Sequence, residues 1–416
     1  MKRIQKVTAV VSIVTILILA VLLGIFLWKE HNGKMTQVAG PEIAGQDTAE
    51  QQGDADEKTD AEQQGDADEK ADAVQMENVD EKADAVQIEN MDEKADAEQS
   101  EKVPEMVSMF FTGDVMLGSS VRSNYNAAGI QGVLSEYLIQ EMTQADITMV
   151  NEEFPFSNRG TPMPDKQYTF RIDPAYISAF HEMGIDVVSL ANNHALDYGT
   201  EALEDTFAVL EEAGIPYVGA GSTKERAEEA AYIECGGRTV GFLSASRVIP
   251  VVEWNIENKQ PGLFCTYDSA ALVAAIEKVR QNCDYLVVYV HWGVEKKAYP
   301  EEYQRVLAQA YIEAGADLVI GAHPHVPQGI EYYQGKPIVY SLGNFIFNPN
   351  MGNTYALKLE WDENGESNLY VIPIATENSL TSELTGQARD EMFHYIEEIS
   401  YDITVDENGL IEPVGQ

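Results

Sequence analysis

The stretch Leu318-Val319-Ile320-Gly321-Ala322-His323-Pro324-His325-Val326 joins a short apolar run to two histidines that are two positions apart. The apolar run follows a segment with a helical pattern and is typical of a buried strand. Both histidines are therefore expected at the carboxyl end of that strand, on a turn that Pro324 stiffens. Two neutral imidazole groups aimed at one point suit a transition metal such as Zn, Fe, Mn or Co. The alternative is two polar loop residues with no joint role, since a His-x-His pair alone is a weak signal.

Four other apolar runs also end in polar residues that are able to bind a metal ion. These junctions are Val107–Thr112 before Asp114, Ile147–Val150 before Glu153, Val187–Leu190 before Asn193 and His194, and Leu286–Val290 before His291. In α/β proteins, ligands bind beyond the carboxyl ends of the strands. We therefore expect these side chains to meet His323 and His325 in one site that holds one or two ions of Mn, Fe or Zn. His194 is alternatively able to donate a proton to a leaving oxygen.

Amphipathic segments lie between these runs, and hairpin patterns follow later in the chain. The expected helices are 199–213, 270–281 and 300–314. Gly214 and Gly315 stand where two of these helices are expected to end. The expected hairpins turn at Gly236-Gly237, at Gln334-Gly335 and at 362–365. Buried strands that alternate with helices and continue into hairpins predict an α/β layered fold with mixed sheets.

The amino end carries Lys2, Arg3 and Lys6 before an apolar run from about residue 7 to 28. A run of roughly 20 apolar residues is long enough to span a bilayer. Because no small-residue cleavage site follows closely, we predict an uncleaved signal anchor in residues 1–34, and a cleaved signal peptide is the alternative. The basic residues predict a cytoplasmic amino terminus and a single-pass protein of the cell membrane, with the bulk of the chain extracellular.

Residues 35–102 have low complexity. The triplet Asp-Glu-Lys begins at positions 56, 68, 80 and 92, a spacing of 12 residues. From residue 50 to 102 there are 20 acidic residues, 5 basic residues and no aromatic residue. Such a segment is unable to bury a core and repels itself, so we predict a disordered acidic linker between the membrane and the following domain.

From residue 103 onward the composition is globular but strongly acidic, with 46 acidic and 17 basic residues. This charge argues against binding to nucleic acid and is compatible with metal cations. The cysteines Cys235, Cys265 and Cys283 are widely spaced and form no metal-binding or redox motif. We interpret them as core residues.

The loop motifs as a set resemble those of the CapA-type poly-γ-glutamate capsule-synthesis family. They are Gly113–Gly118, Asn151–Pro155, Ala191–Gly199, His291–Gly293, Gly321–His325 and Tyr340–Phe345. That family is similar in fold to the calcineurin-like metallophosphoesterases, which implies a four-layer α-β-β-α sandwich of mixed sheets. The resemblance covers roughly residues 105–350, and we predict that the domain spans 103–380 with 381–416 as its C-terminal extension. It also implies a membrane-anchored extracytoplasmic protein that makes, exports or anchors an anionic capsule polymer.

The resemblance assigns roles to single residues of this sequence. The metal ligands that it implies are Asp114, Glu153, Asn193, His291, His323 and His325, and the catalytic histidine is His194. One departure concerns the first strand, where metallophosphoesterases carry Asp-x-His and this chain has Met116 in place of the histidine. A first-metal ligand is therefore missing, and one of the two ions is expected to be weakly bound or absent. The acidic residue after the second strand is also Glu153 where phosphoesterases have aspartate.

Three further residues are candidates for supporting roles. Arg171 is expected to hold a substrate carboxylate or phosphate, and a surface ion pair is the alternative. Asp197 is expected to orient His194 in catalysis, and a helix cap is the alternative. Asn344, in the last motif, is assigned with Arg171 to substrate binding.

Two functions from different classes agree with these patterns. The first is a metal-dependent, phosphoesterase-like hydrolase or transferase that acts on a phosphoester, an amide or an ester bond of a cell-surface polymer. The second is a non-catalytic, polymer-binding accessory subunit of a capsule-synthesis complex. The expected partners are the anionic polymer or its precursor and membrane-embedded capsule-synthesis subunits, with no nucleic acid. The fold alone does not decide between the two functions.

Overall fold

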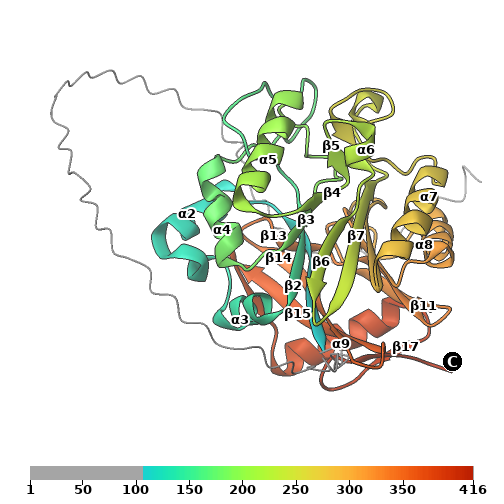
Figure 1. The fold of residues 1–416 in the computed structure, drawn as a ribbon. Coiled ribbons are helices and arrows are strands. Elements are labelled where there is room, and N and C mark those ends of the chain that lie inside the picture. The colour runs from blue at the N-terminus through green and yellow to red at the C-terminus, as the bar shows by residue number, and fades with distance from the viewer. Residues whose placement is uncertain (1–105, 416) are drawn as a thin grey trace, which may run out of the picture. The chain divides into compact units, whose positions relative to one another are not determined.

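The computed structural model describes residues 106–415, which contain two β-sheets and the helices around them (Figure 1). The predicted signal anchor at 1–34 and the predicted acidic linker at 35–102 lie outside the described residues. Within 106–415, every helix is too short or too polar to cross a bilayer.

The larger sheet combines parallel and antiparallel strands. Its path is β16 (Leu380–Glu383), β15 (Ser367–Glu377), β14 (Met351–Trp361), β1 (Val107–Val115), β2 (Ile147–Glu152), β3 (Val187–Ser189) and β4 (Tyr217–Val218), and β13 (Asn344–Ile346) also pairs with β1. Strands β1 to β4 are parallel to one another, whereas the pairs β1–β14, β14–β15 and β15–β16 are antiparallel. The carboxyl ends of β1, β2 and β3 therefore lie at one edge of this sheet.

The smaller sheet has the same mixed character. Its order is β11 (Gln328–Tyr333), β12 (Lys336–Ser341), β10 (Leu318–Ala322), β9 (Tyr285–His291), β7 (Arg238–Ser246) and β6 (Ala231–Cys235). The four central strands are parallel, and β11 and β6 pair with them as the predicted antiparallel hairpins. Two short pairs complete the described strands, β5 (Ala220–Gly221) with β8 (Gly262–Leu263) and β17 (Ile403–Val405) with β18 (Ile411–Pro413).

The two sheets pack face to face around an inner core, and helices cover their outer faces. Strand β1 shows the alternation that causes this, because Met109 and Phe111 enter the inner core whereas Phe110 enters the core under the helices. The larger sheet is covered by α2 (Ser119–Ala128), α3 (Glu136–Gln144), α4 (Ile177–Glu182) and α5 (Thr200–Ala213). The smaller sheet is covered by α7 (Ala270–Val279) and α8 (Glu302–Ala314). This arrangement, visible in Figure 1, confirms the predicted α/β fold with mixed sheets and places its layers in the order α-β-β-α.

The remaining helices are short, except α9, which packs against the core between the two sheets. They are α6 (Lys224–Ala227), α9 (Gly386–Ile399) and the 3-10 turns Gly129–Gly132, Pro174–Tyr176, Val252–Trp254 and Arg280–Asn282. Helix α9 places Met392, Phe393 and Ile396 in the core between the sheets. The segment from residue 381 onward therefore packs against the same core as the strands before it.

The predicted helix ends agree closely with the structure. Gly214 and Gly315 follow α5 and α8 with φ of 71° and 119°, a conformation that favours glycine. The helix expected at 270–281 ends at Val279 and continues as a 3-10 turn. Helices α2, α3, α4 and α9 were not expected.

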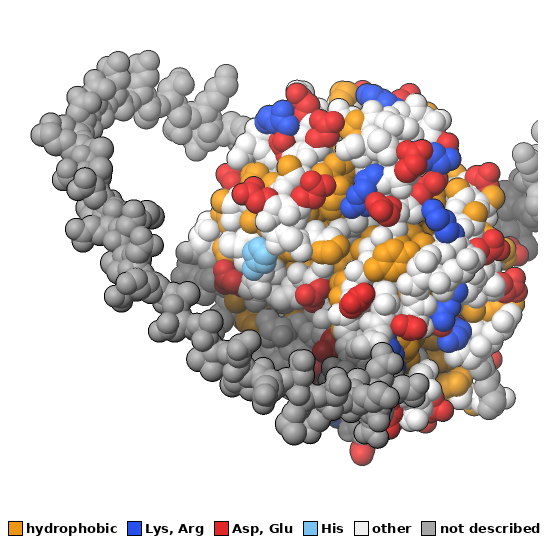
Figure 2. All heavy atoms as spheres, in the orientation of Figure 1, with side chains coloured by type: hydrophobic (Ala, Val, Ile, Leu, Met, Phe, Trp, Pro, Cys, Tyr) orange, Lys and Arg blue, Asp and Glu red, His pale blue; other side chains and the backbone are white. Residues whose placement is uncertain are grey.

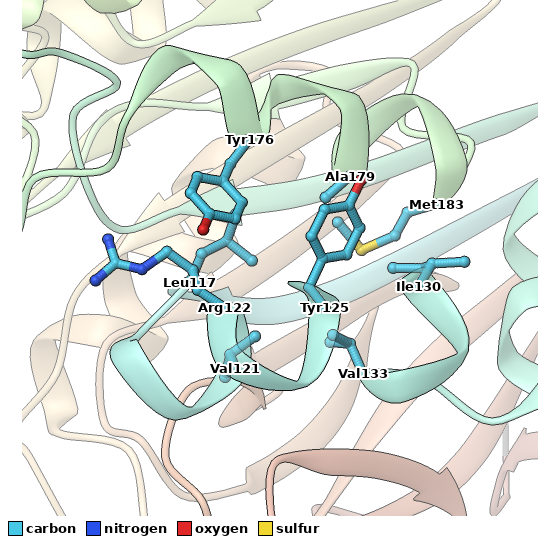
Figure 3. Close-up of a pocket in the computed structure, with 9 residues that line it drawn as sticks. All are labelled: Leu117, Val121, Arg122, Tyr125, Ile130, Val133, Tyr176, Ala179 and Met183. Atoms are coloured by element: carbon cyan, nitrogen blue, oxygen red, sulfur yellow. The ribbon is translucent and has the colours of Figure 1, made fainter. Parts of the chain in front are cut away.

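Helices α2 and α4 pack closely against each other over the larger sheet (Figure 3). The cavity between them has a volume of about 10 Å³ and is lined mainly by apolar side chains, among them Val121, Ile130 and Met183. A volume of this size holds one water molecule at most. This cavity is therefore a packing feature and offers no room for a substrate.

Two glycines allow the strand ends to approach each other. A Cβ atom on Gly113 would lie 1.8 Å from the carbonyl oxygen of Gly343, and one on Gly321 would lie 1.9 Å from that of Tyr340. Both positions therefore require glycine, because any side chain would collide with backbone atoms. These close approaches bring the residues that follow β1 and β10 to one edge of the two sheets.

Candidate metal centre

Three side chains from different strand ends converge at the edge shared by the two sheets. Asp114 is the second-last residue of β1, Glu153 directly follows β2, and His325 lies three residues after β10. Each offers one ligand atom, and these atoms all lie within 4.8 Å of one another. The three residues therefore form a group that is able to hold a metal ion, as the sequence predicts.

Hydrogen bonds fix the first part of this group. Asn151 Nδ2 donates to Asp114 Oδ1 at 2.8 Å, and His325 Nδ1 donates to Asn344 Oδ1 at 2.8 Å. Asp114 Oδ2 lies 3.1 Å from the same His325 nitrogen, which is close enough for an ion pair. Asn344 was expected to bind substrate, but the structure places its side chain against His325. Its contact orients a candidate ligand.

Three more of the predicted ligands lie beside this group. His291 Nε2 is 2.8 Å from Asn193 Oδ1 and 3.2 Å from Glu153 Oε1. The ring of His323 packs against that of His291, with 4.8 Å between their centroids. All six residues expected to bind metal are therefore gathered at this edge of the sheets.

The turn after β10 has an unusual backbone that brings both of its histidines into the site. His323 and His325 have φ of 96° and 59°, a region that non-glycine residues seldom adopt. Each such residue costs on the order of 1–3 kcal/mol and persists only where the surrounding structure imposes it. Strain of this kind is common at binding sites.

Several buried atoms in this group have no hydrogen-bond partner among the described residues. They are Asp114 Oδ2, Glu153 Oε2 and His323 Nδ1. An unpartnered buried polar atom costs about 1–3 kcal/mol, and more when it is charged. Burial and the charge of Asp114 raise the pKa of Glu153 well above its usual value, and burial lowers the pKa of His323 to about 4. A cation would satisfy these oxygen and nitrogen atoms together, so the donor set fits a divalent metal ion.

His325 differs from the other two histidines in its electrostatics. Burial alone would lower its pKa, but the ion-pair contact with Asp114 and the charges of Glu153 and Asp114 raise the pKa to about 10. For His291, burial and the neighbouring histidines hold the pKa well below its usual value. One imidazolium therefore balances the carboxylates until a metal ion displaces its proton.

A second cluster of polar groups surrounds His194. Its Nδ1 donates to Asp197 Oδ2 at 2.7 Å, while Phe170 N donates to the same oxygen at 2.8 Å. Asp197 was considered either as a partner of His194 or as a helix cap. The helix-cap interpretation is wrong, because the N-cap position of α5 is Gly199 and no side chain caps this helix. The contact leaves His194 Nε2 without a hydrogen bond from the other described residues.

Lys166 completes this second cluster and was not expected from the sequence. Its ammonium donates to the backbone oxygen of Asn193 and forms an ion pair with Asp197. Only 13% of its side chain is exposed, and burial lowers its pKa despite the charge of Asp197. Nothing in the sequence separates this lysine from other loop lysines, because its partners follow strands that are distant in the sequence.

Arg171 contacts a backbone oxygen and an aromatic ring. Its guanidinium donates to the backbone oxygen of Arg159 at 2.9 Å and lies over the ring of Tyr198 at 4.3 Å. Within residues 106–415 it forms no ion pair, so the alternative of a surface ion pair is wrong, and substrate binding by Arg171 stays a prediction. The neighbouring Phe170 packs on His194, with 4.7 Å between ring centroids.

Two asparagines that were not expected to have a role hold the loops together. Asn151 Nδ2, which binds Asp114, also lies 3.3 Å from His291 Nδ1. Asn192 Nδ2 donates to the backbone oxygen of Glu152 at 2.6 Å, and its Oδ1 accepts from the backbone nitrogen of His194 at 3.0 Å. A signal was present in the sequence, since both asparagines belong to the motifs that contain predicted ligands.

Comparison with known proteins shows the family of this chain. Residues 108–349 match the family model described as "Bacterial capsule synthesis protein PGA_cap". The chain is 32% identical over 284 residues to a capsule biosynthesis protein CapA of Bacillus anthracis, covering 65% of this chain and 67% of that relative. It is 30% identical over 279 residues to a PGA biosynthesis protein CapA of Bacillus subtilis (strain 168), covering 65% of this chain and 72% of that relative.

Among solved structures, the chain resembles a conserved uncharacterized protein of Streptococcus pneumoniae TIGR4 described as a predicted phosphoesterase. The match has 11% sequence identity and a TM-score of 0.26, and it covers 68% of this chain and 98% of that one. A TM-score this low supports no statement about activity. The family assignment depends on the sequence matches: the chain belongs to the bacterial capsule synthesis family PGA_cap, together with the CapA proteins that it resembles.

Proposed function

We propose that this protein is a metal-dependent hydrolase or transferase that acts on a capsule polymer of the poly-γ-glutamate type or on its precursor. The observation that carries the proposal is the group of buried, unpartnered ligand atoms on Asp114, Glu153 and His323. Buried charged and polar atoms without partners are costly, so their convergence indicates a cation that completes the site. The family supplies the polymer class.

The chain offers two sets of ligands for Mn, Fe or Zn. Asp114, Glu153 and His325 form the first set, and Asn193, His291 and His323 lie beside them. Met116 stands at the position where the metallophosphoesterase motif has a histidine, and its side chain packs in the core under the helices. The first set therefore lacks one ligand of a binuclear centre. We therefore propose one firmly bound ion and, at most, a second weaker one. A divalent ion here supplies a Lewis acid that polarises a carbonyl or phosphoryl oxygen.

His194 is the proposed proton donor to the leaving group. Asp197 holds the Nδ1 proton of its ring, so Nε2 is left to carry the proton that is exchanged with substrate. Burial lowers the pKa of His194, so the ring is a stronger acid once its Nε2 has taken up a proton. Lys166 compensates the charge of Asp197 and fixes the backbone of Asn193, so His194 and a candidate ligand keep their relative positions.

Aromatic rings cover the two ends of the site and limit the access of water. Phe170 packs on His194, and Phe347 packs on His325 with 4.9 Å between ring centroids. The two phenylalanines also contact each other edge to face, at 6.3 Å. Electrostatic interactions are stronger where water is excluded, so this cover favours the proposed chemistry.

The proposal includes a location and partners that follow from the sequence. We propose that residues 1–34 anchor the protein in the cell membrane, that its amino terminus is cytoplasmic and that the domain is extracellular. Acidic side chains are spread across the face drawn in Figure 2, which is unfavourable for nucleic acid. The proposed partners are the polymer and membrane-embedded subunits of capsule synthesis.

A non-catalytic accessory role is the second candidate. Met116 favours it, because a missing ligand weakens the site at which an attacking water would be activated. In that case the metal ion would stabilise the loops or bind the polymer. Both candidates require a metal ion, and only the first requires His194.

Elemental analysis of the purified full chain tests the metal site. We expect one to two equivalents of Mn, Fe or Zn, and the loss of most of this metal in His323→Ala. His394→Ala is the matched control, because 81% of that side chain is exposed. No metal in the wild-type protein after reloading, or equal metal content in all three proteins, would contradict the proposal.

Activity then separates the two candidates. The metal-loaded protein is incubated with poly-γ-glutamate, and cleaved or transferred chains are measured beside His194→Gln. For the enzyme we expect the rate to fall by about 100-fold or more in this variant while its metal content is unchanged. A metal-loaded wild-type protein that binds polymer without turnover would support the accessory role.

A further inference from the structure

Two glutamines beneath the loop that follows β9 are completely buried, and the proposed mechanism does not use them. Gln304 lies on α8 and Gln328 is the first residue of β11, and neither has any exposed surface. Gln304 Nε2 donates to Gln328 Oε1 at 2.9 Å, and Gln304 Oε1 accepts from the backbone nitrogen of Glu301 at 2.8 Å. Buried amide groups that satisfy each other in this way form a rigid part of the fold.

Gln328 uses its NH2 group to hold the loop between β9 and α8. Its Nε2 donates to the backbone oxygens of Lys297 at 3.0 Å and of Tyr299 at 3.3 Å. The side chains at 294–297 and that of Tyr299 are exposed, so this part of the loop gains little from burial of its own side chains. The position of the loop therefore depends on hydrogen bonds to its backbone, and Gln328 makes two of them.

The same loop contacts the turn that carries two of the candidate ligands. The backbone nitrogen of Lys296 donates to the oxygen of Pro324 at 2.8 Å, and a Cβ atom on Gly293 would lie 3.0 Å from the ring of this proline. Pro324 stands between His323 and His325, which both have positive φ. Such a backbone persists only where the surrounding structure imposes it. The loop is part of that structure on one side of the turn.

The direction of the hydrogen bonds requires an amide at both buried positions. The two loop carbonyl groups only accept hydrogen bonds, so Gln328 must direct its NH2 group at them and its oxygen at Gln304. Gln304 must then donate to Gln328 and accept from Glu301. A glutamate at position 328 would place an oxygen against two carbonyl oxygens, and an apolar side chain would leave both without this donor.

We propose that Gln328 is a positioning residue of the candidate metal centre and that Gln304 holds it in place. Through the loop 293–301, Gln328 keeps the turn of His323 and His325 in the geometry that binds a cation. Contacts outside the ligand set orient the ligands, and their removal commonly lowers metal affinity by roughly 10- to 100-fold. The inference rests on the metal-dependent function proposed above and adds two residues that touch no ligand atom.

The test compares Gln328→Met with Gln309→Met in the full chain. Methionine has a similar length but no hydrogen-bond donor. Gln309→Met is the matched control, because Gln309 Nε2 donates to Glu331 Oε1 at 2.9 Å and so also joins α8 to β11, without a bond to the loop. The probe is Co²⁺, whose affinity is measured by competition with a chromophoric chelator and whose visible absorption reports its coordination geometry.

We expect Gln328→Met to weaken Co²⁺ binding by about 10-fold and to change the absorption spectrum, whereas Gln309→Met keeps the affinity and the spectrum of the wild type. Denaturant unfolding of the metal-free proteins is measured in parallel. Both variants lose a hydrogen bond and are expected to be less stable, so stability alone does not account for a difference between them. Gln304→Met removes only the partner that fixes Gln328 and should weaken binding by less, about threefold.

Each outcome decides the inference. Weakening confined to Gln328→Met and Gln304→Met supports it. Equal weakening in Gln309→Met, or wild-type affinity and spectrum in Gln328→Met, overturns it and leaves the proposed metal site standing. If Gln328→Met does not fold, Gln304→Met decides in the same way. A folded wild-type protein that binds no Co²⁺ overturns the inference and the metal site together.

Discussion

Two buried polar clusters lie side by side at the carboxyl edge of the sheets, and they differ in how their charges are compensated. In the first cluster, Asp114 and Glu153 each keep a carboxylate oxygen without a hydrogen-bond partner among the described residues. In the second, Asp197 accepts hydrogen bonds from His194, Phe170 and Lys166. The first cluster therefore keeps ligand atoms without a hydrogen bond despite the positive charge of His325, whereas in the second cluster both oxygens of Asp197 are bound. This difference makes the first cluster the candidate metal site.

The largest expected effect is the loss of metal binding in Asp114→Asn. The asparagine keeps a hydrogen bond to Asn151 but removes the negative charge, so we expect metal affinity to fall by more than about 100-fold. Competition with a chromophoric chelator measures the affinity. Asp268→Asn is the control, because it removes an equal charge from an exposed residue that accepts a bond from Ala270. Similar affinities in the two variants would place the metal elsewhere.

Breaking the second cluster should affect stability instead of metal binding. Lys166→Met leaves the buried carboxylate of Asp197 without its cation, and we expect the free energy of unfolding to fall by about 3 kcal/mol. Denaturant unfolding measures this change, and metal content should remain that of the wild type. Lys224→Met, which removes an exposed ion pair with Glu257, should change stability little. A large loss of metal in Lys166→Met would show that the two clusters are not independent.

Removing the metal ion should destabilise the protein by an amount that depends on its concentration. At a free metal concentration 100 times the dissociation constant, binding stabilises the fold by about 2.7 kcal/mol. Melting curves with and without a chelator should therefore differ by several degrees. Lys166→Met should retain this response and Asp114→Asn should lose it. A response in Asp114→Asn equal to that of the wild type would remove the distinction between the clusters.

The smallest expected effect concerns Glu152, which directly precedes Glu153 in the sequence but has no side-chain contact with either cluster among the described residues. Both of its carboxylate oxygens are buried without a partner among the described residues, and burial raises its pKa well above the usual value. The folded state therefore retains a proton that the unfolded chain loses near pH 4.3, so this group costs stability increasingly as the pH rises above that value. Glu152→Gln should increase the free energy of unfolding at pH 7 by about 1 kcal/mol and leave it unchanged below pH 4.

Unfolding of both proteins across this pH range measures the difference. Glu363→Gln, an exposed position in a turn, is the control and should show no such pH dependence. A Glu152→Gln variant that is less stable than the wild type at pH 7 would mean that the carboxylate has a partner, such as a bound cation.

The sequence predicts correctly that the candidate ligands meet at one edge, because each of them is marked by the apolar run that immediately precedes it. Asp114, His291 and His323 each follow an apolar run, and the carboxyl ends of parallel strands meet wherever those runs pair. Helices α2, α3 and α4 were not expected, because each is short and shows too few apolar positions to mark a period. Lys166 was missed for another reason, since its role arises from contacts between segments that are distant in the chain.

The sequence by itself determined the α/β class with mixed sheets, the hairpins, the helix ends at Gly214 and Gly315, and the membership of the candidate metal set. These features follow from the hydrophobic periodicity of the sequence and from the chemistry of individual side chains. Both are properties of the local sequence and do not depend on tertiary contacts. Only the tertiary structure decided that Asn344 orients His325, that Asp197 pairs with Lys166, and that Arg171 is held by backbone oxygens. These contacts join loops that the close backbone approaches at Gly113 and Gly321 bring together. The separation of two residues along the chain does not reveal which loops meet.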